Sequence, residues 1–99
     1  GPQRVISLIK QFEAALPDAE QDLRKACDAQ DSDALDAALH SFKGAALTLG
    51  LMAAGKQAQS LRPPAPCSLM EVEALFATAR QDIAQVQQLL AQSSGKSAA

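Results

Sequence analysis

Residues 35–50, LDAALHSFKGAALTLG, alternate apolar and polar side chains with the period of an α-helix. At about 100° per residue, five apolar side chains fall within roughly 80° of the helix surface: Leu35, Leu39, Phe42, Ala46 and Leu49. His40, the only histidine of the chain, and Gly44 lie on the opposite side, and Lys43 lies at the edge of the apolar stripe. The stretch therefore predicts an amphipathic helix that buries one face and presents an imidazole to solvent.

Gly44 is an unfavourable residue for the middle of this predicted helix. A glycine there costs roughly 1 kcal/mol relative to alanine, because it has more backbone freedom to lose. Gly44 follows His40 by one helical turn, so a bare stretch of helix surface lies beside the imidazole. We interpret this glycine as the residue that lets a bulky partner reach the ring.

The spacing His40, Lys43, Gly44 and then Gly50 resembles the signature of the histidine phosphotransfer (HPt) family, H-x-x-K/R-G with a second glycine six residues later. The amphipathic pattern extends the resemblance from about Val5 to Leu90. The resemblance implies that the distal ring nitrogen of His40 accepts a phosphoryl group from a receiver-domain aspartate and passes it to another receiver. It also implies that Lys43 stabilises charge on the moving group, that this chain needs no cofactor or metal, and that the Mg²⁺ belongs to the receiver.

Four further residues are candidates for partner binding. Leu47 projects about 20° from His40 on the predicted outward face, and Ala37 projects close to Gly44, which makes a small apolar patch for a receiver. Gln59 and Arg62 fall on the next predicted helix, and HPt domains often place a glutamine near the imidazole. The glycine at the intervening turn leaves the orientation of Gln59 and Arg62 open.

The remaining apolar residues predict helices on both sides of the central one. A first short helix ends or bends at Pro17, which then begins the next helix. Ser68 to Glu71 is a capping box that opens the longest helix, and Asp31 or Ser32 caps the central one. We expect an all-α fold, an antiparallel up-down four-helix bundle with an additional short N-terminal helix that caps one end. The expected domains are an expression-tag scar at 1–2, the bundle at 3–92 and a flexible tail at 93–99.

Composition and charge narrow the functional classes. A net charge of −2 argues against a nucleic-acid binder, but eight of the eleven acids precede His40. Residues 37–70 contain no acid and three cations, Lys43, Lys56 and Arg62, which favours an anionic partner. No apolar run is long enough to span a membrane. We therefore expect a monomeric cytoplasmic domain, free or attached to a membrane-bound sensor kinase, with Cys27 and Cys67 as reduced thiols.

The sequence also favours a phosphoryl-carrier domain over the phosphoacceptor domain of a sensor kinase. It has no glycine-rich phosphate loop, and Ser41 follows the histidine where the phosphoacceptor domain of a sensor kinase usually has an acid. The expected role is a phosphoryl carrier without kinase activity of its own, whose partners are receiver domains and the kinase portion of a parent hybrid histidine kinase. The alternative is a helical adaptor that docks a receiver or a kinase domain without accepting phosphate.

Overall fold

The computed structural model describes residues 2–62 and 68–98, and the side chains of residues 3–62 and 68–92. Apart from short connections, this part of the chain is helical and contains no strand, which confirms the prediction of an all-α fold. Its helices are α1 (Pro2–Asp28), α2 (Ser32–Thr48), α3 (Met52–Ser60) and α4 (Leu69–Ala98). Helix α4 includes residues 93–98, most of the segment for which we expected a flexible tail. Cys67 and most of the proline-rich connection after Arg62 lie outside the described residues.

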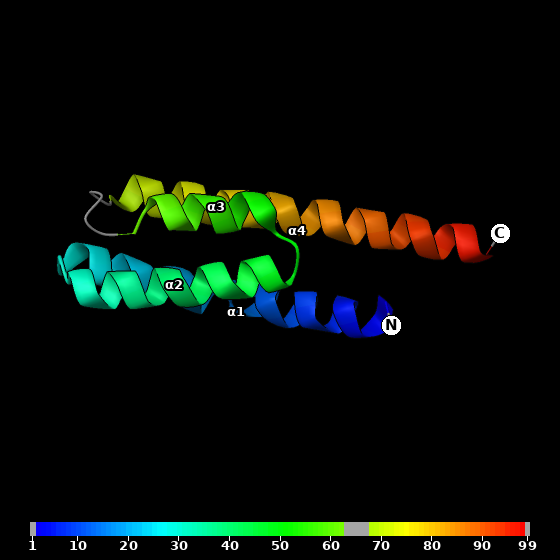
Figure 1. Cartoon of the computed structure of the whole chain (residues 1–99), viewed down its shortest axis with the longest axis horizontal. Coiled ribbons are helices and arrows are strands. Elements are labelled where there is room, and N and C mark those ends of the chain that lie inside the picture. Colours follow the sequence, from blue (N-terminus) through cyan, green and yellow to red (C-terminus); the bar gives the residue numbers. More distant parts are fainter. Residues whose placement is uncertain (1, 63–67, 99) are drawn as a thin grey trace.

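Successive helices run in opposite directions and form an elongated molecule of 53 × 17 × 17 Å (Figure 1). Each helix packs against the helix before it and the helix after it, and α1 also packs against α4. The short α3 leaves α1 and α4 extending beyond it toward the end where both termini lie (Figure 1). Among the described helices, none combines the length and the apolar character that crossing a membrane requires.

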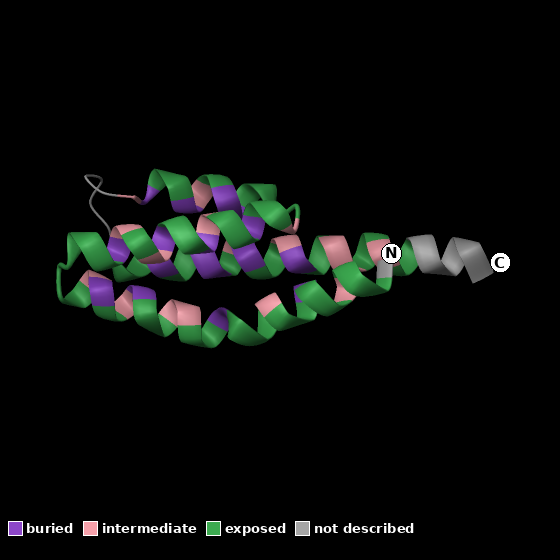
Figure 2. Cartoon of the chain, turned by 60° about the horizontal axis from the view of Figure 1, so that its bottom comes forward, coloured by how far each residue is buried: buried purple, intermediate pink, exposed green. Residues whose placement is uncertain are grey.

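The expectation of an additional short N-terminal helix is wrong, because α1 continues through Pro17. Proline removes one backbone hydrogen bond and costs about 3 kcal/mol within a helix. Burial of apolar side chains offsets this cost. Three residues along one side of α1 are at most 1% exposed: Ile9, Leu16 and Leu23. Burying each such side chain contributes about 1.5–3 kcal/mol, so a continuous helix is favoured. Figure 2 shows α1, which starts at the N label, as a bowed helix, in keeping with a proline in its interior.

The core fixes how α2 is rotated about its own axis. Phe42 packs between Phe12 of α1 and Phe76 of α4, with ring centroids 5.6 and 5.1 Å apart. The predicted inward positions Leu35, Leu39 and Ala46 are also buried. With this stripe held inward, the opposite side of α2 faces solvent, as the periodicity predicts.

Gly50 ends α2 and sets the approach of α3. Its φ of +80° is in the left-handed region, and Leu51 N–H donates to the Ala46 carbonyl over 2.8 Å. After the turn, Gly55 allows α3 to approach α2 closely, since a Cβ there would lie 2.5 Å from Leu47 Cδ2. The break predicted at Gly50 is confirmed. The close approach at Gly55 places α3 next to the edge of the solvent-exposed side of α2.

Gln30 ends α1 in the same left-handed conformation without being a glycine, at φ +53°. Asp31 N–H donates to the Ala26 carbonyl over 3.0 Å, and the Asp31 carboxylate then caps α2 by accepting from Ala34 N–H over 3.1 Å. The predicted N-cap is therefore Asp31. A residue with a Cβ pays about 1 kcal/mol or more for this conformation.

We expect Gln30→Gly to raise the free energy of unfolding by about 0.5–1 kcal/mol, because glycine adopts positive φ without that cost. Gln30→Ala is the matched control, since alanine keeps the Cβ and its strain. Urea unfolding followed by circular dichroism measures both. An equal gain for the alanine variant would show that the glutamine side chain, and not the backbone, is unfavourable here.

Candidate functional site

His40 lies on the exposed side of α2, about halfway along the helix. Its chain neighbour Leu39 is fully buried, and Phe42 is 5% exposed. These two core residues hold the helix so that the imidazole faces solvent. The outward position predicted for His40 is confirmed.

Lys43, one turn after His40, is half-buried and spans the gap between α2 and α3. Its Nζ donates to Gln59 Oε1 over 2.8 Å. The contact brings Gln59, near the end of α3, to the turn of α2 that follows His40. Sequence reasoning left the orientation of Gln59 open, because it depends on how tightly the chain turns at Gly50.

Arg62, directly after α3, forms an ion pair with Asp36 of α2. Arg62 Nε lies 2.7 Å from Asp36 Oδ1, and Nη2 lies 3.3 Å from Oδ2. Arg62 Nη1 also donates to Gln59 Oε1 over 3.4 Å. Asp36, Lys43, Gln59 and Arg62 thus form one polar network that links α2 and α3 beside His40.

The structure corrects the expected distribution of charge around the imidazole. Residues 37–70 contain no acid, but Asp36 stands just before this stretch, one helical turn ahead of His40. Its carboxylate neutralises Arg62, so Lys43 is the cation of the network whose partner is uncharged. The spacing of four residues to His40 could have drawn attention to Asp36. Its pairing with Arg62, 26 residues away, needed the fold.

The Arg62 guanidinium holds the pKa of the Asp36 carboxyl below its usual value, and His40 lowers it further. A lowered pKa means that the pair stabilises the fold above the usual aspartate pKa of about 3.9. This stabilisation is lost as the pH falls through the lowered pKa of the folded state.

We expect Asp36 to titrate below the usual aspartate range and Arg62→Gln to return its pKa toward that range. Carbon-13 chemical shifts of the Asp36 carboxyl, recorded against pH, measure both. Arg80→Gln is the control, because it removes a cation that pairs with Glu20 instead. An unchanged Asp36 titration in Arg62→Gln would contradict the pairing.

Gly44 leaves open space beside the site. A Cβ built on this glycine meets nothing within 4 Å, and its backbone is ordinary helix. Neither tight packing nor unusual backbone geometry explains the glycine. The interpretation that it keeps the surface next to His40 clear agrees with this geometry.

Leu47 and Ala37, the predicted apolar patch, are both exposed on α2. Leu47 is 37% exposed and rests on Gly55 of α3, where its Cδ2 takes the space that a side chain would fill. Ala37 is exposed in the turn before His40. The patch is therefore two small apolar areas, one on each side of the imidazole along the helix.

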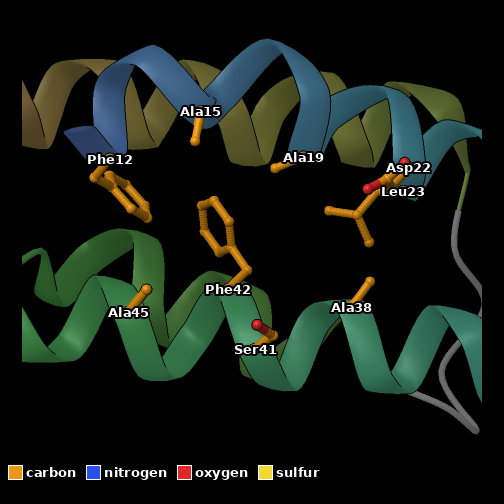
Figure 3. Close-up of a pocket in the computed structure, with 9 residues that line it drawn as sticks. All are labelled: Phe12, Ala15, Ala19, Asp22, Leu23, Ala38, Ser41, Phe42 and Ala45. Atoms are coloured by element: carbon orange, nitrogen blue, oxygen red, sulfur yellow. The ribbon is translucent and has the colours of Figure 1, made fainter. Parts of the chain in front are cut away.

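A mainly apolar groove between α1 and α2 was missed by the sequence analysis (Figure 3). We call it the α1–α2 groove. It has a volume of about 270 Å³, and Figure 3 shows its lining residues: Phe12, Ala15, Ala19, Asp22, Leu23, Ala38, Ser41, Phe42 and Ala45. Ser41 projects about 100° from His40 around α2, in the opposite sense from Lys43, so the groove lies on the side of α2 away from the polar network. Its alanines carry no pattern that distinguishes them from ordinary core residues.

The exposed imidazole of His40 and the nearby ammonium of Lys43 suit nucleophilic attack on an anionic group. Neutral imidazole is a good nucleophile near pH 7, and a neighbouring ammonium stabilises an anionic transferring group. Within the described residues, no three His, Cys, Asp or Glu side chains gather in a way that would hold a metal ion. The chemistry that these residues themselves support is attack by His40 on an electrophilic anion.

In a comparison with protein families, residues 7–71 match the family model described as Hpt domain. The match covers most of α1, all of α2 and α3, and the start of α4. It includes His40 and all four residues of the polar network. No curated protein and no solved structure matches the chain significantly.

Proposed function

The chain belongs to the Hpt domain family, and we propose that His40 carries a phosphoryl group between receiver-domain aspartates in a multistep phosphorelay. Hpt domains are phosphocarrier modules of two-component signalling and have no kinase activity of their own. The observation that carries the proposal is the exposed imidazole of α2 with Lys43 half-buried one turn later, inside the matched region.

In the proposed reaction, the distal nitrogen of the neutral His40 ring attacks the phosphorus of an aspartyl phosphate. The nitrogen–phosphorus bond forms as the phosphorus–oxygen bond to the aspartyl group breaks, and the aspartate leaves as a carboxylate. The other ring nitrogen keeps its proton, so the attacking atom needs no general base. The reverse sequence with a second receiver returns the phosphoryl group to an aspartate.

Lys43 and Gln59 supply the surroundings of the transferring group in this proposal. The Lys43 ammonium stabilises negative charge on the phosphoryl oxygens. This stabilisation is greatest when the ammonium is already held in position before the reaction. Its hydrogen bond to Gln59 provides that fixation. No cofactor is proposed for this chain, and the Mg²⁺ that neutralises the acyl phosphate is assigned to the receiver.

The receiver is proposed to dock over the exposed side of α2. Leu47 and Ala37 flank His40 along the helix, and the α1–α2 groove adds apolar surface across it. We propose an antiparallel up-down four-helix bundle as the scaffold. The packing of each helix against the next, and of α1 against α4, supports this topology. We propose that the domain acts as a monomer and forms one module of a hybrid sensor kinase, whose kinase portion is a further partner.

Gly44 provides a prediction that separates access from stability. Gly44→Ala should raise the free energy of unfolding by up to about 1 kcal/mol, because alanine favours helix and its Cβ enters open space. Gly44→Gln should also fold, but should slow phosphotransfer by crowding His40. Urea unfolding and transfer rates are measured on both variants. A destabilised alanine variant, or a glutamine variant with the normal rate, would contradict the access interpretation.

A loading and discharge experiment tests the proposed function. The chain is incubated with a panel of phosphorylated receivers, separated from them, and mixed with a second receiver that carries no phosphate. We expect label to appear first on the chain and then on the second receiver. Binding of receivers without any label on the chain would overturn the proposal and support the adaptor alternative.

A further inference from the structure

We propose that Asp36 and Arg62 form a clamp that positions Gln59, and through it Lys43, beside His40. The inference rests on the proposed function, because positioning has a consequence for rate only if His40 is the phosphoryl acceptor. It adds Asp36 to the residues that support transfer, as a positioning residue that acts through Arg62.

The ion pair fixes Arg62 more firmly than a single contact would. Both oxygens of Asp36 accept from the guanidinium, over 2.7 and 3.3 Å, so its plane is set by two bonds. The arginine side chain is 26% exposed. Because Asp36 belongs to α2 and Arg62 follows α3, the pair also ties the end of α3 to the helical turn before His40.

Arg62 and Lys43 together determine which way the Gln59 amide faces. Both side chains only donate hydrogen bonds, so the amide atom between them has to be the oxygen. Oε1 accepts from Lys43 over 2.8 Å and from Arg62 over 3.4 Å. Neither Lys43 nor Arg62 can accept a hydrogen bond from the Gln59 amide nitrogen, so in this proposal its N–H groups donate to a phosphoryl oxygen. The clamp thus holds an N–H donor and an ammonium in fixed relation to each other.

Loss of Asp36 would release this arrangement while adding net positive charge near His40. The two effects would change the rate of phosphotransfer in opposite directions. A clamp predicts slower transfer, because misplaced groups stabilise the transition state less well. A carboxylate that merely weakens a useful cation predicts faster transfer, since Arg62 would become available to the phosphoryl group.

A double-mutant cycle with Asp36→Asn, Arg62→Gln and the double variant tests the clamp. Transfer from a phosphorylated receiver is measured at saturating receiver, with receiver affinity and circular dichroism recorded for each variant. We expect each single variant to slow transfer roughly tenfold with little change in affinity. The double variant should be no slower than either single one, because both changes break the same device. Asp33→Asn is the matched control, as it removes one exposed charge from α2 outside the network and should leave the rate unchanged.

The proton and nitrogen resonances of the Gln59 side-chain amide provide a readout independent of transfer. They should shift in Asp36→Asn as in Arg62→Gln, and remain in place in Asp33→Asn. A rate equal to or above that of the unaltered chain in Asp36→Asn, multiplicative losses in the double variant, or an unmoved Gln59 amide would overturn the clamp. An unaltered chain that takes no label would instead overturn the proposed function, and the amide resonances would still decide whether the clamp exists.

Discussion

His40→Gln is expected to abolish phosphoryl acceptance from every phosphorylated receiver while leaving the helical fold intact. The variant removes the proposed nucleophile, and the glutamine amide nitrogen cannot take its place. The side chain is exposed on α2, and substitutions at such positions change stability by about 0.5 kcal/mol or less. Radiolabel transfer and circular dichroism on the same preparation measure the two effects.

Ser32→Ala is the matched control for this variant, because it removes an exposed polar side chain from the same helix, outside the polar network and outside the α1–α2 groove. It should accept label normally. Label on His40→Gln would show that another residue is the acceptor. A collapse of helical circular dichroism in His40→Gln would show that the imidazole has a structural role.

Lys43→Ala is expected to lower the transfer rate at saturating receiver by about tenfold to a hundredfold. A fixed cation directed at developing charge acts mainly in the transition state, so the maximal rate should fall more than the affinity. The variant also leaves Gln59 with Arg62 alone. Rapid-quench measurements over a range of receiver concentrations separate the maximal rate from the affinity.

Lys56→Ala provides the comparison, since it removes the same charge from the exposed surface of α3. It should change the affinity slightly at low salt and leave the maximal rate as it was. Equal losses of maximal rate in Lys43→Ala and Lys56→Ala would mean that general positive charge, and not the position of Lys43, accelerates transfer.

The central helix was predictable from the sequence because one periodicity determines both its faces. The spacing of Leu35, Leu39 and Phe42 fixes which side is buried, and His40 then faces outward without knowledge of any other helix. The break at Gly50 was equally local, because a positive φ favours glycine. These features depend only on neighbouring residues.

The path of α1 and the surroundings of His40 depend on tertiary packing and were predicted less well. Pro17 favours a helix end, and only the burial of Ile9 and Leu23 on one continuous stripe overrides that preference. The pairing of Asp36 with Arg62 likewise depends on the register between α2 and α3. No local pattern encodes that register.

Transfer through His40 is tested most sharply by the position and chemistry of the phosphoryl group on the chain. The chain is loaded from phosphorylated receivers and, separately, from the small donor phosphoramidate, and then studied by phosphorus-31 NMR and peptide mapping. We expect one phosphoryl group on the distal nitrogen of His40, lost in acid and retained in alkali. A phosphoryl group on Ser41, stable to acid, or no phosphoryl group from either source, would contradict it.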